Sequence, residues 1–167
     1  MPPSELSALR LDGELYALGP AWSPVDLPED HEARAAALGT LFAGRLVADR
    51  LSAAWVHGAT DRLPAPIPCC VPATDRGAAG LVPGLDIREL RLHEHDVVHL
   101  AGLRLTSPVR TAVDLLRGDA FTSVQSDAVA RLADSPAARK EIDAVLGQRR
   151  FAAGASRARH RLRLSGG

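Results

Sequence analysis

Aromatic residues are scarce in this sequence, at 4% of its 167 residues, although 46% of the residues are hydrophobic. The apolar positions are filled mainly by Ala, Leu and Val, which predicts a helix-rich core of small side chains. Without interleaved aromatic residues, a stacking platform for single-stranded nucleic acid is disfavoured. The length suits a chain that buries a single core.

Long apolar runs and dispersed cysteines are also missing. No stretch approaches the roughly 18 apolar residues of a membrane-spanning helix, and no charged-then-apolar leader begins the chain. We therefore expect a cytoplasmic protein without a membrane partner. The two cysteines, Cys69 and Cys70, are adjacent. Because adjacent side chains on a strand point to opposite faces, we expect two reduced thiols rather than a disulfide.

Sequence signatures of common enzymes are absent. The chain has no G-x-S-x-G elbow, no Walker loop and no dinucleotide fingerprint, so we expect no cofactor. Glu94-His95-Asp96 and Glu141-Ile142-Asp143 offer spaced carboxylates but lack an upstream Gly-Ser loop. The one lysine, Lys140, lies in a predicted helix beside Glu141. We expect a non-enzymatic protein, with a metal-dependent nuclease or nucleotidyltransferase as a less favoured alternative.

His93, His95 and His99, with neighbouring acids, form the densest group of potential metal ligands. On a strand, His93 and His95 would share a face, but His99 would require a bend, and the cysteines lack C-x-x-C spacing. A solvated strand edge is the favoured interpretation, and we expect no metal site.

Charge is unevenly distributed, although the net charge is zero. Residues 1–148 carry 14 basic and 20 acidic groups, whereas the next 15 residues contain six arginines and no acid. Helical spacing would place Arg157 with Arg161, and Arg159 with Arg163, on two adjacent basic stripes that can face a phosphate backbone. We therefore expect contact with double-stranded DNA through this tail. The predicted DNA-binding residues are Arg149, Arg150, Arg157, Arg159, Arg161 and Arg163. The alternative is a solvated helix that docks through Ala158 and Leu162.

Turn and cap signals predict an α+β fold with a small mixed sheet packed by helices, a wing-like N-terminal ribbon and a helical C-terminal half. We divide the chain into a short helix and ribbon (1–28), a core (29–148) and a basic helix and tail (149–167). The ribbon is expected over 14–25, helices over 30–42 and 50–57, an edge strand over 67–71, a strand over 86–92 and a hairpin over 97–105. Further helices are expected over 120–133, 136–146 and 155–164.

The segment from Thr106 to Leu116 contains a legible helix start. Pro108 suits a first helical turn, and Thr106 or Ser107 can accept hydrogen bonds from the free amides beyond it. Arg110 and Asp114 lie four residues apart, but the Arg-before-Asp order is the weaker one for an exposed pair. We therefore expect a structural role, in which Arg110 ties the helix start to the sheet and Asp114 accepts from Arg110 or the backbone.

The segment Leu51-Ser-Ala-Ala-Trp55-Val-His57-Gly58 reads as a helix that ends at a C-terminal glycine. His57 lies at that helix end, where a structural role is expected. Trp55 and Gly58 therefore join the predicted structural motif of Thr106, Pro108, Arg110 and Asp114.

Taken in order, three segments resemble the AbiEi family of antitoxins from type IV toxin–antitoxin systems. They are the ribbon Asp12-Gly-Glu-Leu-Tyr16, the Ala-Ala-Trp55 segment, and Thr106-Ser-Pro-Val-Arg110-Thr-Ala-Val-Asp114-Leu. The resemblance covers roughly residues 5–164 and makes 29–148 an AbiEi-like core. It is to a short form with a truncated winged helix–turn–helix, because about eleven residues precede Asp12 and such a motif needs about forty.

The resemblance implies an antitoxin that represses its own operon and counters a nucleotidyltransferase toxin without forming a stable complex. Together with the arginine tail, it predicts a non-enzymatic regulator that contacts DNA through basic residues. The alternative is a protein-interaction module or degenerate scaffold without DNA binding.

Overall fold

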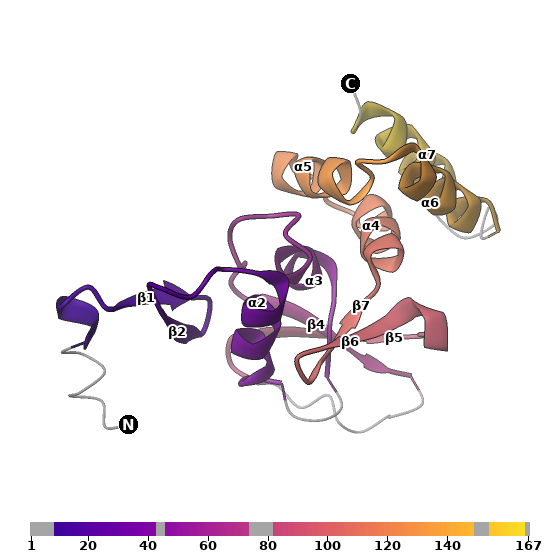
Figure 1. Ribbon diagram of the computed structural model, residues 1–167. Helices are drawn as coiled ribbons and strands as arrows, with labels where there is room; N and C mark the ends of the chain where they lie inside the picture. Colours follow the sequence, from indigo (N-terminus) through magenta and orange to yellow (C-terminus); the bar gives the residue numbers. More distant parts are fainter. Residues whose placement is uncertain (1–8, 43–45, 74–81, 149–153, 166–167) are drawn as a thin grey trace.

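The computed structural model describes residues 9–42, 46–73, 82–148 and 154–165. An N-terminal ribbon leads into a sheet with two helices packed against it, and four further helices follow at the C-terminal end of the chain (Figure 1). Strands and helices are segregated, which confirms the predicted α+β class. No helix within these residues is long and apolar enough to cross a membrane.

The ribbon consists of β1 (Leu15–Leu18) and β2 (Ala21–Pro24), paired antiparallel as predicted. Leu18 is buried and packs in one cluster with Leu38 and Trp55 of the following helices. One end of the ribbon is thus anchored on the core, while Trp22 remains exposed under the guanidinium of Arg10, whose carbon lies 5.1 Å from the ring centroid.

The main sheet contains β3 (Val47–Ala48), β4 (Ile67–Pro72), β5 (Leu85–Leu90), β6 (Val97–Leu100) and β7 (Leu103–Thr106). Its strand order is β5-β4-β3-β7-β6. The β4–β5 and β3–β7 pairs are parallel, and the β3–β4 and β6–β7 pairs are antiparallel, so the sheet is mixed as expected.

The prediction of β4 as an edge strand is wrong, because β4 lies between β5 and β3. Its prolines are tolerated there for a geometric reason. The N–H of Ile67 donates toward the β5 side, and N–H directions alternate along a strand, so the positions of Pro68 and Pro72 face β3. The short β3 pairs only with Cys69 and Cys70, so neither proline removes a hydrogen bond from this ladder.

The hairpin of β6 and β7 turns at Ala101 and Gly102, with φ angles of +45° and +80°. Two consecutive positive φ angles define the turn that matches strand twist, which explains the Ala-Gly signal in the sequence. The expected strand over 86–92 ends at Leu90. His93 precedes a short 3₁₀ helix, η1 (Glu94–Asp96), which contains His95. The strand edge considered for these two histidines is therefore not formed.

Two helices pack with the ribbon and the sheet (Figure 1). Helix α2 (His31–Gly39) begins where Asp30 caps it, accepting from the N–H of Ala33 at 2.8 Å, and ends three residues before the predicted Phe42. Helix α3 (Arg50–Val56) ends within one residue of prediction, and Asp49 stands at its N-cap without making a side-chain cap bond.

The C-terminal half is helical, as predicted: α4 (Pro108–Arg117), α5 (Ser123–Leu132), α6 (Pro136–Gln148) and α7 (Ala155–Leu164). Helix α7 has the predicted bounds. Helix α5 begins three residues late because Thr122 and Gln125 form a reciprocal capping box that sets its first turn.

Helix α3 is shared by the two hydrophobic cores. Its Ala54 packs with the α4–α7 helices, whereas Ala53, Trp55 and Val56 pack with the ribbon, α2 and the sheet. Small residues on α3 permit this close approach from both sides, which agrees with the small-residue core expected from composition.

The ring of His57, just after α3, hydrogen bonds the carbonyl oxygen of Thr106 at the end of β7 through Nε2, at 2.8 Å. Burial lowers the pKa of His57, and the neighbouring charge of His31 lowers it further, although the Thr106 hydrogen bond opposes the shift. The neutral ring therefore joins the last turn of α3 to the strand that leads into α4.

This pKa shift predicts acid sensitivity. The unfolded chain binds the His57 proton more readily than the folded chain, so the free energy of unfolding should fall as pH decreases below about 6.5. Urea unfolding at about pH 7.5 and pH 5.5 should show a smaller acid loss for His57→Gln than for the parent. The exposed His160→Gln is the control and should retain the parent's full acid loss. Equal losses in all three proteins would contradict this role.

Candidate functional site

The segment from Thr106 to Leu116 begins α4. The hydroxyl of Ser107 accepts from the N–H of Arg110 at 3.3 Å, and Pro108 occupies the first helical turn. The hydroxyls of Thr106 and Thr111 are 2.7 Å apart and both buried. These contacts fix the direction in which α4 leaves the sheet.

The segment from Leu51 to Gly58 joins α3 to its surroundings. Trp55 is buried, and the guanidinium carbon of Arg34 lies 5.3 Å from its ring centroid. Arg34 also donates to the carbonyl oxygens of Trp55 and Thr60, at 2.8 and 3.2 Å. Gly58 follows α3 with φ +72°, a left-handed conformation that favours glycine. The motif therefore terminates α3 and ties it to α2.

Arg110 is buried, with 3% of its surface exposed. Its Nε donates to Oδ1 of Asp114 at 3.0 Å, and its Nη1 donates to Oδ2 of Asp96 at 2.9 Å. The same Nη1 donates to the carbonyl oxygen of Arg91 at 3.3 Å. Arg110 thus connects α4 to η1 and to the chain just after β5.

The ion pairs continue from Asp114 across the sheet. Arg88 of β5 donates to Oδ2 of Asp114 at 3.0 Å and to Oδ2 of Asp49 at 2.5 Å. Asp49 also pairs with Arg50 at 3.1 Å, and Arg50 pairs with Asp86 at 2.8 Å. We call this connected set the ion-pair chain. In order, its members are Asp86, Arg50, Asp49, Arg88, Asp114, Arg110 and Asp96.

Electrostatics explain why the signs alternate. Asp49 has no exposed surface, and burial raises its pKa, while the charges of Arg88 and Arg50 act in the opposite direction. An unpaired buried carboxylate is costly, so Asp49 requires both guanidinium groups. Every carboxylate of the ion-pair chain faces an arginine. The arrangement holds α3, α4, β5 and η1 together. It leaves none of the four carboxylates of the ion-pair chain positioned as a free acid or base.

The cysteines lie on β4, an interior strand of the sheet, as free, buried thiols. Burial, aided by the nearby charge of Asp49, raises the pKa of Cys69 to about 12 and that of Cys70 still further. Both thiols are therefore protonated at neutral pH and are poor nucleophiles, because the thiolate is the reactive species.

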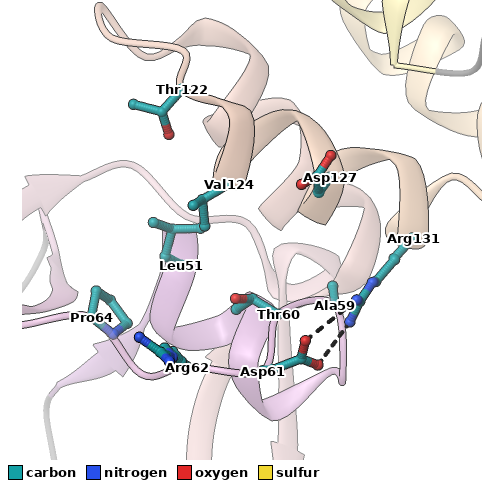
Figure 2. A pocket seen from close by; sticks show the side chains of 10 residues that line it. All are labelled: Leu51, Ala59, Thr60, Asp61, Arg62, Pro64, Thr122, Val124, Asp127 and Arg131. Carbon is teal, nitrogen blue, oxygen red and sulfur yellow. Dashed lines mark hydrogen bonds and ion pairs between the residues drawn. The ribbon is translucent and has the colours of Figure 1, made fainter.

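A surface depression of about 460 Å³ lies between the loop after α3 and the start of α5 (Figure 2). Leu51 and Val124 approach one another in it, and Arg131 pairs with Asp61 at 2.9 and 3.4 Å at one end. The Arg131 hydrogen bond lowers the pKa of the exposed Asp61. These side chains bring together no nucleophile with a base, so the depression shows no catalytic arrangement.

The histidine-rich segment does not form a metal centre within the described part of the chain, where no group of three potential ligands is brought together. The rings of His93 and His95 are stacked, with centroids 5.5 Å apart and planes within 1° of parallel. His99 lies on β6 and is exposed.

Each of the two predicted basic stripes of α7 has one arginine that binds another part of the protein and one that is exposed. Arg161 donates to the carbonyl oxygens of Leu116 and Gly118, at 2.9 and 2.6 Å, and its guanidinium carbon lies 4.7 Å from the ring centroid of Phe121. It therefore binds the C-terminal end of α4, where carbonyl groups lack helical partners. Arg159 pairs with Asp143 of α6 at 3.2 Å.

Arg157 and Arg163 remain exposed on α7. Within the described residues, the one ion pair of Arg157 is a long contact with the fully exposed Asp119, at 3.5 Å. The exposed His160 lies three residues from each of them, so the three side chains form one inclined row on the helix surface. We call Arg157, His160 and Arg163 the α7 row. The predicted Arg149 and Arg150 lie outside the described residues.

Three members of the ion-pair chain, Arg88, Arg50 and Asp86, had no signal in the sequence. They come from β5 and α3, and Asp49 and Arg88 are 39 residues apart. Asp49 gave a signal as a helix cap, but its carboxylate binds arginines instead. Helical periodicity predicts ion pairs within one helix, but it carries no information on ion pairs between different helices and strands.

Loss of Asp114 should be severely destabilising, because Asp114 pairs with both Arg110 and Arg88. Without it, the buried guanidinium of Arg110 and that of Arg88 each lose one carboxylate partner. We expect Asp114→Ala to lower the free energy of unfolding by about 3–5 kcal/mol. Urea unfolding measures this loss. Asp119→Ala, just after the C-terminal end of α4, is the matched control and should change stability by less than about 0.5 kcal/mol. Similar midpoints for the two variants would refute the structural role of the pair.

Comparison with known proteins agrees with this architecture. The chain is similar to the crystal structure of the RV2827C protein from Mycobacterium tuberculosis, with a TM-score of 0.55 and 22% sequence identity. The match covers the whole of this chain and 66% of that protein, so this chain spans just under two thirds of its length. No curated protein matches the sequence. The family model of the AbiEi antitoxin C-terminal domain matches residues 42–164, which include the sheet, the ion-pair chain and α4–α7. The chain therefore belongs to the AbiEi antitoxin family.

Proposed function

We propose that this chain is a non-enzymatic antitoxin that regulates its own operon and contacts the backbone of duplex DNA through the α7 row. Family membership supports an antitoxin role. The observation that carries the DNA contact is the exposure of Arg157, His160 and Arg163 in one row of α7, whose other two arginines, Arg159 and Arg161, bind the fold.

Contact with DNA phosphates requires cationic side chains that are exposed and not already bound to other groups of the protein. Arg161 and Arg159 already bind carbonyl and carboxylate oxygens, so they position the helix rather than the DNA. The buried Ala158 and Leu162 hold the opposite side of α7 against the helical core. A docked helix that presents Arg157 and Arg163 at a fixed spacing suits a regularly charged backbone better than a flexible tail would.

A non-enzymatic role is supported by the ion-pair chain, whose carboxylates are each opposed by an arginine. As the partner, we propose a nucleotidyltransferase toxin that is countered without a stable complex. Co-expression with the toxin encoded beside it should restore growth, and affinity purification should recover the antitoxin alone.

A protein-interaction module is the second candidate, and the ribbon region favours it. Leu11, Trp22, Val25 and Leu27 are between 43% and 84% exposed, which is unusual for large apolar side chains in one short segment. A toxin that co-purifies in a fixed ratio, and that dissociates when Trp22 and Val25 are changed to Ser, would establish this alternative.

Salt dependence tests the DNA proposal. For DNA from upstream of the operon, the slope of log K against log salt should become shallower by about 0.9 for each phosphate that is no longer bound, hence by about 1.8 for Arg157→Ala with Arg163→Ala. The matched control is Arg62→Ala with Arg91→Ala, which removes two exposed arginines elsewhere. An unchanged slope in the α7 variant, or an equal change in the control, would overturn the assignment.

A further inference from the structure

A recess of about 540 Å³ lies over the sheet beside β6 and β7. Its polar walls are His93, Glu94, His99 and Arg104, and its apolar lining includes Pro72 and Val97. It is distinct from the α7 row and from the depression beside α5, with which it shares no lining residue.

The register of the β-hairpin explains why the basic side chains meet. His99 and Arg104 are directly paired across the two strands, so their side chains project from the same face of the sheet. Leu105 and Val98 are also paired, and they pack in the core cluster with α2. Because side chains alternate, His99 and Arg104 lie on the face opposite α2.

His93 and Glu94 form the rim of the recess, and the ion-pair chain fixes this rim. The N–H of His93 donates to Oδ2 of Asp96 at 2.9 Å, and Oδ2 also accepts from Arg110 at 2.9 Å. The His93 ring also stacks parallel to the ring of His95, with centroids 5.5 Å apart. Thus the rim is held by a buried guanidinium rather than left as a loose loop.

We propose that this recess binds the phosphate group of a small phosphorylated molecule, with Arg104, His99 and His93 as its donors. Guanidinium and imidazole N–H groups are suitable phosphate donors, and an arginine presents two of them side by side. In the described part of the chain, Arg104 makes no hydrogen bond or ion pair, so its donors are free for a ligand. Among the described residues of the lining, Glu94 is the one carboxylate, and its charge opposes a phosphate while its oxygens can accept from a ligand N–H or O–H.

The shape of the site favours a small ligand over a polymer. A recess of this volume is within the range of sites for small molecules, about 300–1,000 Å³. A metal ion is disfavoured because the described residues bring no third ligand to the histidines. The inference is independent of DNA binding by α7, since no residue is common to both sites.

Pyrophosphate is the probe for this site, titrated at low ionic strength by isothermal calorimetry and by thermal unfolding. The parent should bind one pyrophosphate per chain saturably and melt at a higher temperature with it. Arg104→Ala and His99→Ala should each weaken binding about tenfold. Glu94→Gln should strengthen binding several-fold, because it removes the opposing charge and keeps the shape of the side chain.

Arg91→Ala is the matched control, since Arg91 is exposed nearby but does not line the recess. It should bind pyrophosphate as the parent does. The proposal fails if the folded parent does not bind saturably, if Arg104→Ala binds equally well, or if Glu94→Gln binds more weakly. It also fails if Arg104→Ala makes the DNA salt slope shallower, because the recess would then belong to the DNA-binding path. Loss of DNA binding in the α7 variants would leave pyrophosphate binding unaffected.

Discussion

The buried guanidinium of Arg110 is the constraint on which the rest of the structure depends. Moving an arginine out of water is costly unless carboxylates and carbonyls surround it in good geometry. Asp96 and Asp114 meet that requirement from different elements, and Asp114 in turn engages Arg88. The positions of α4, η1 and β5 are therefore not independent: a shift of any one of them leaves a buried charge without its partner.

The sequence predicts well wherever a signal and its effect lie within one element. Ser107 and Pro108 begin α4, the ribbon pairs as expected, and α7 has its predicted bounds, because caps, alternation and helical periodicity act over a few residues. It predicts poorly where the outcome depends on a distant partner. The two prolines of β4 suggested an edge strand, and only the shortness of β3 shows how an interior strand accommodates them.

The C-terminal arginines show the same limit for function. Spacing along a helix predicts which side chains share a line, but it does not predict which line faces the core. The end of α4 supplies carbonyl groups that bind Arg161, and α6 supplies Asp143 for Arg159. An arginine near such groups becomes part of the fold. What remains is a row spaced by three residues, Arg157, His160 and Arg163, in place of the two rows spaced by four.

Family membership and local chemistry carry different information about this chain. The matched family domain, residues 42–164, contains the ion-pair chain and the helices α4–α7, which build the scaffold. Groups that bind partners must instead keep free donors at the surface. Arg104 in its recess and Arg163 on α7 both do so, but one lies in a hollow beside a carboxylate and the other on a convex helix. That difference in shape separates the proposed site for a small anion from the proposed surface for duplex DNA, although both use the same side chain.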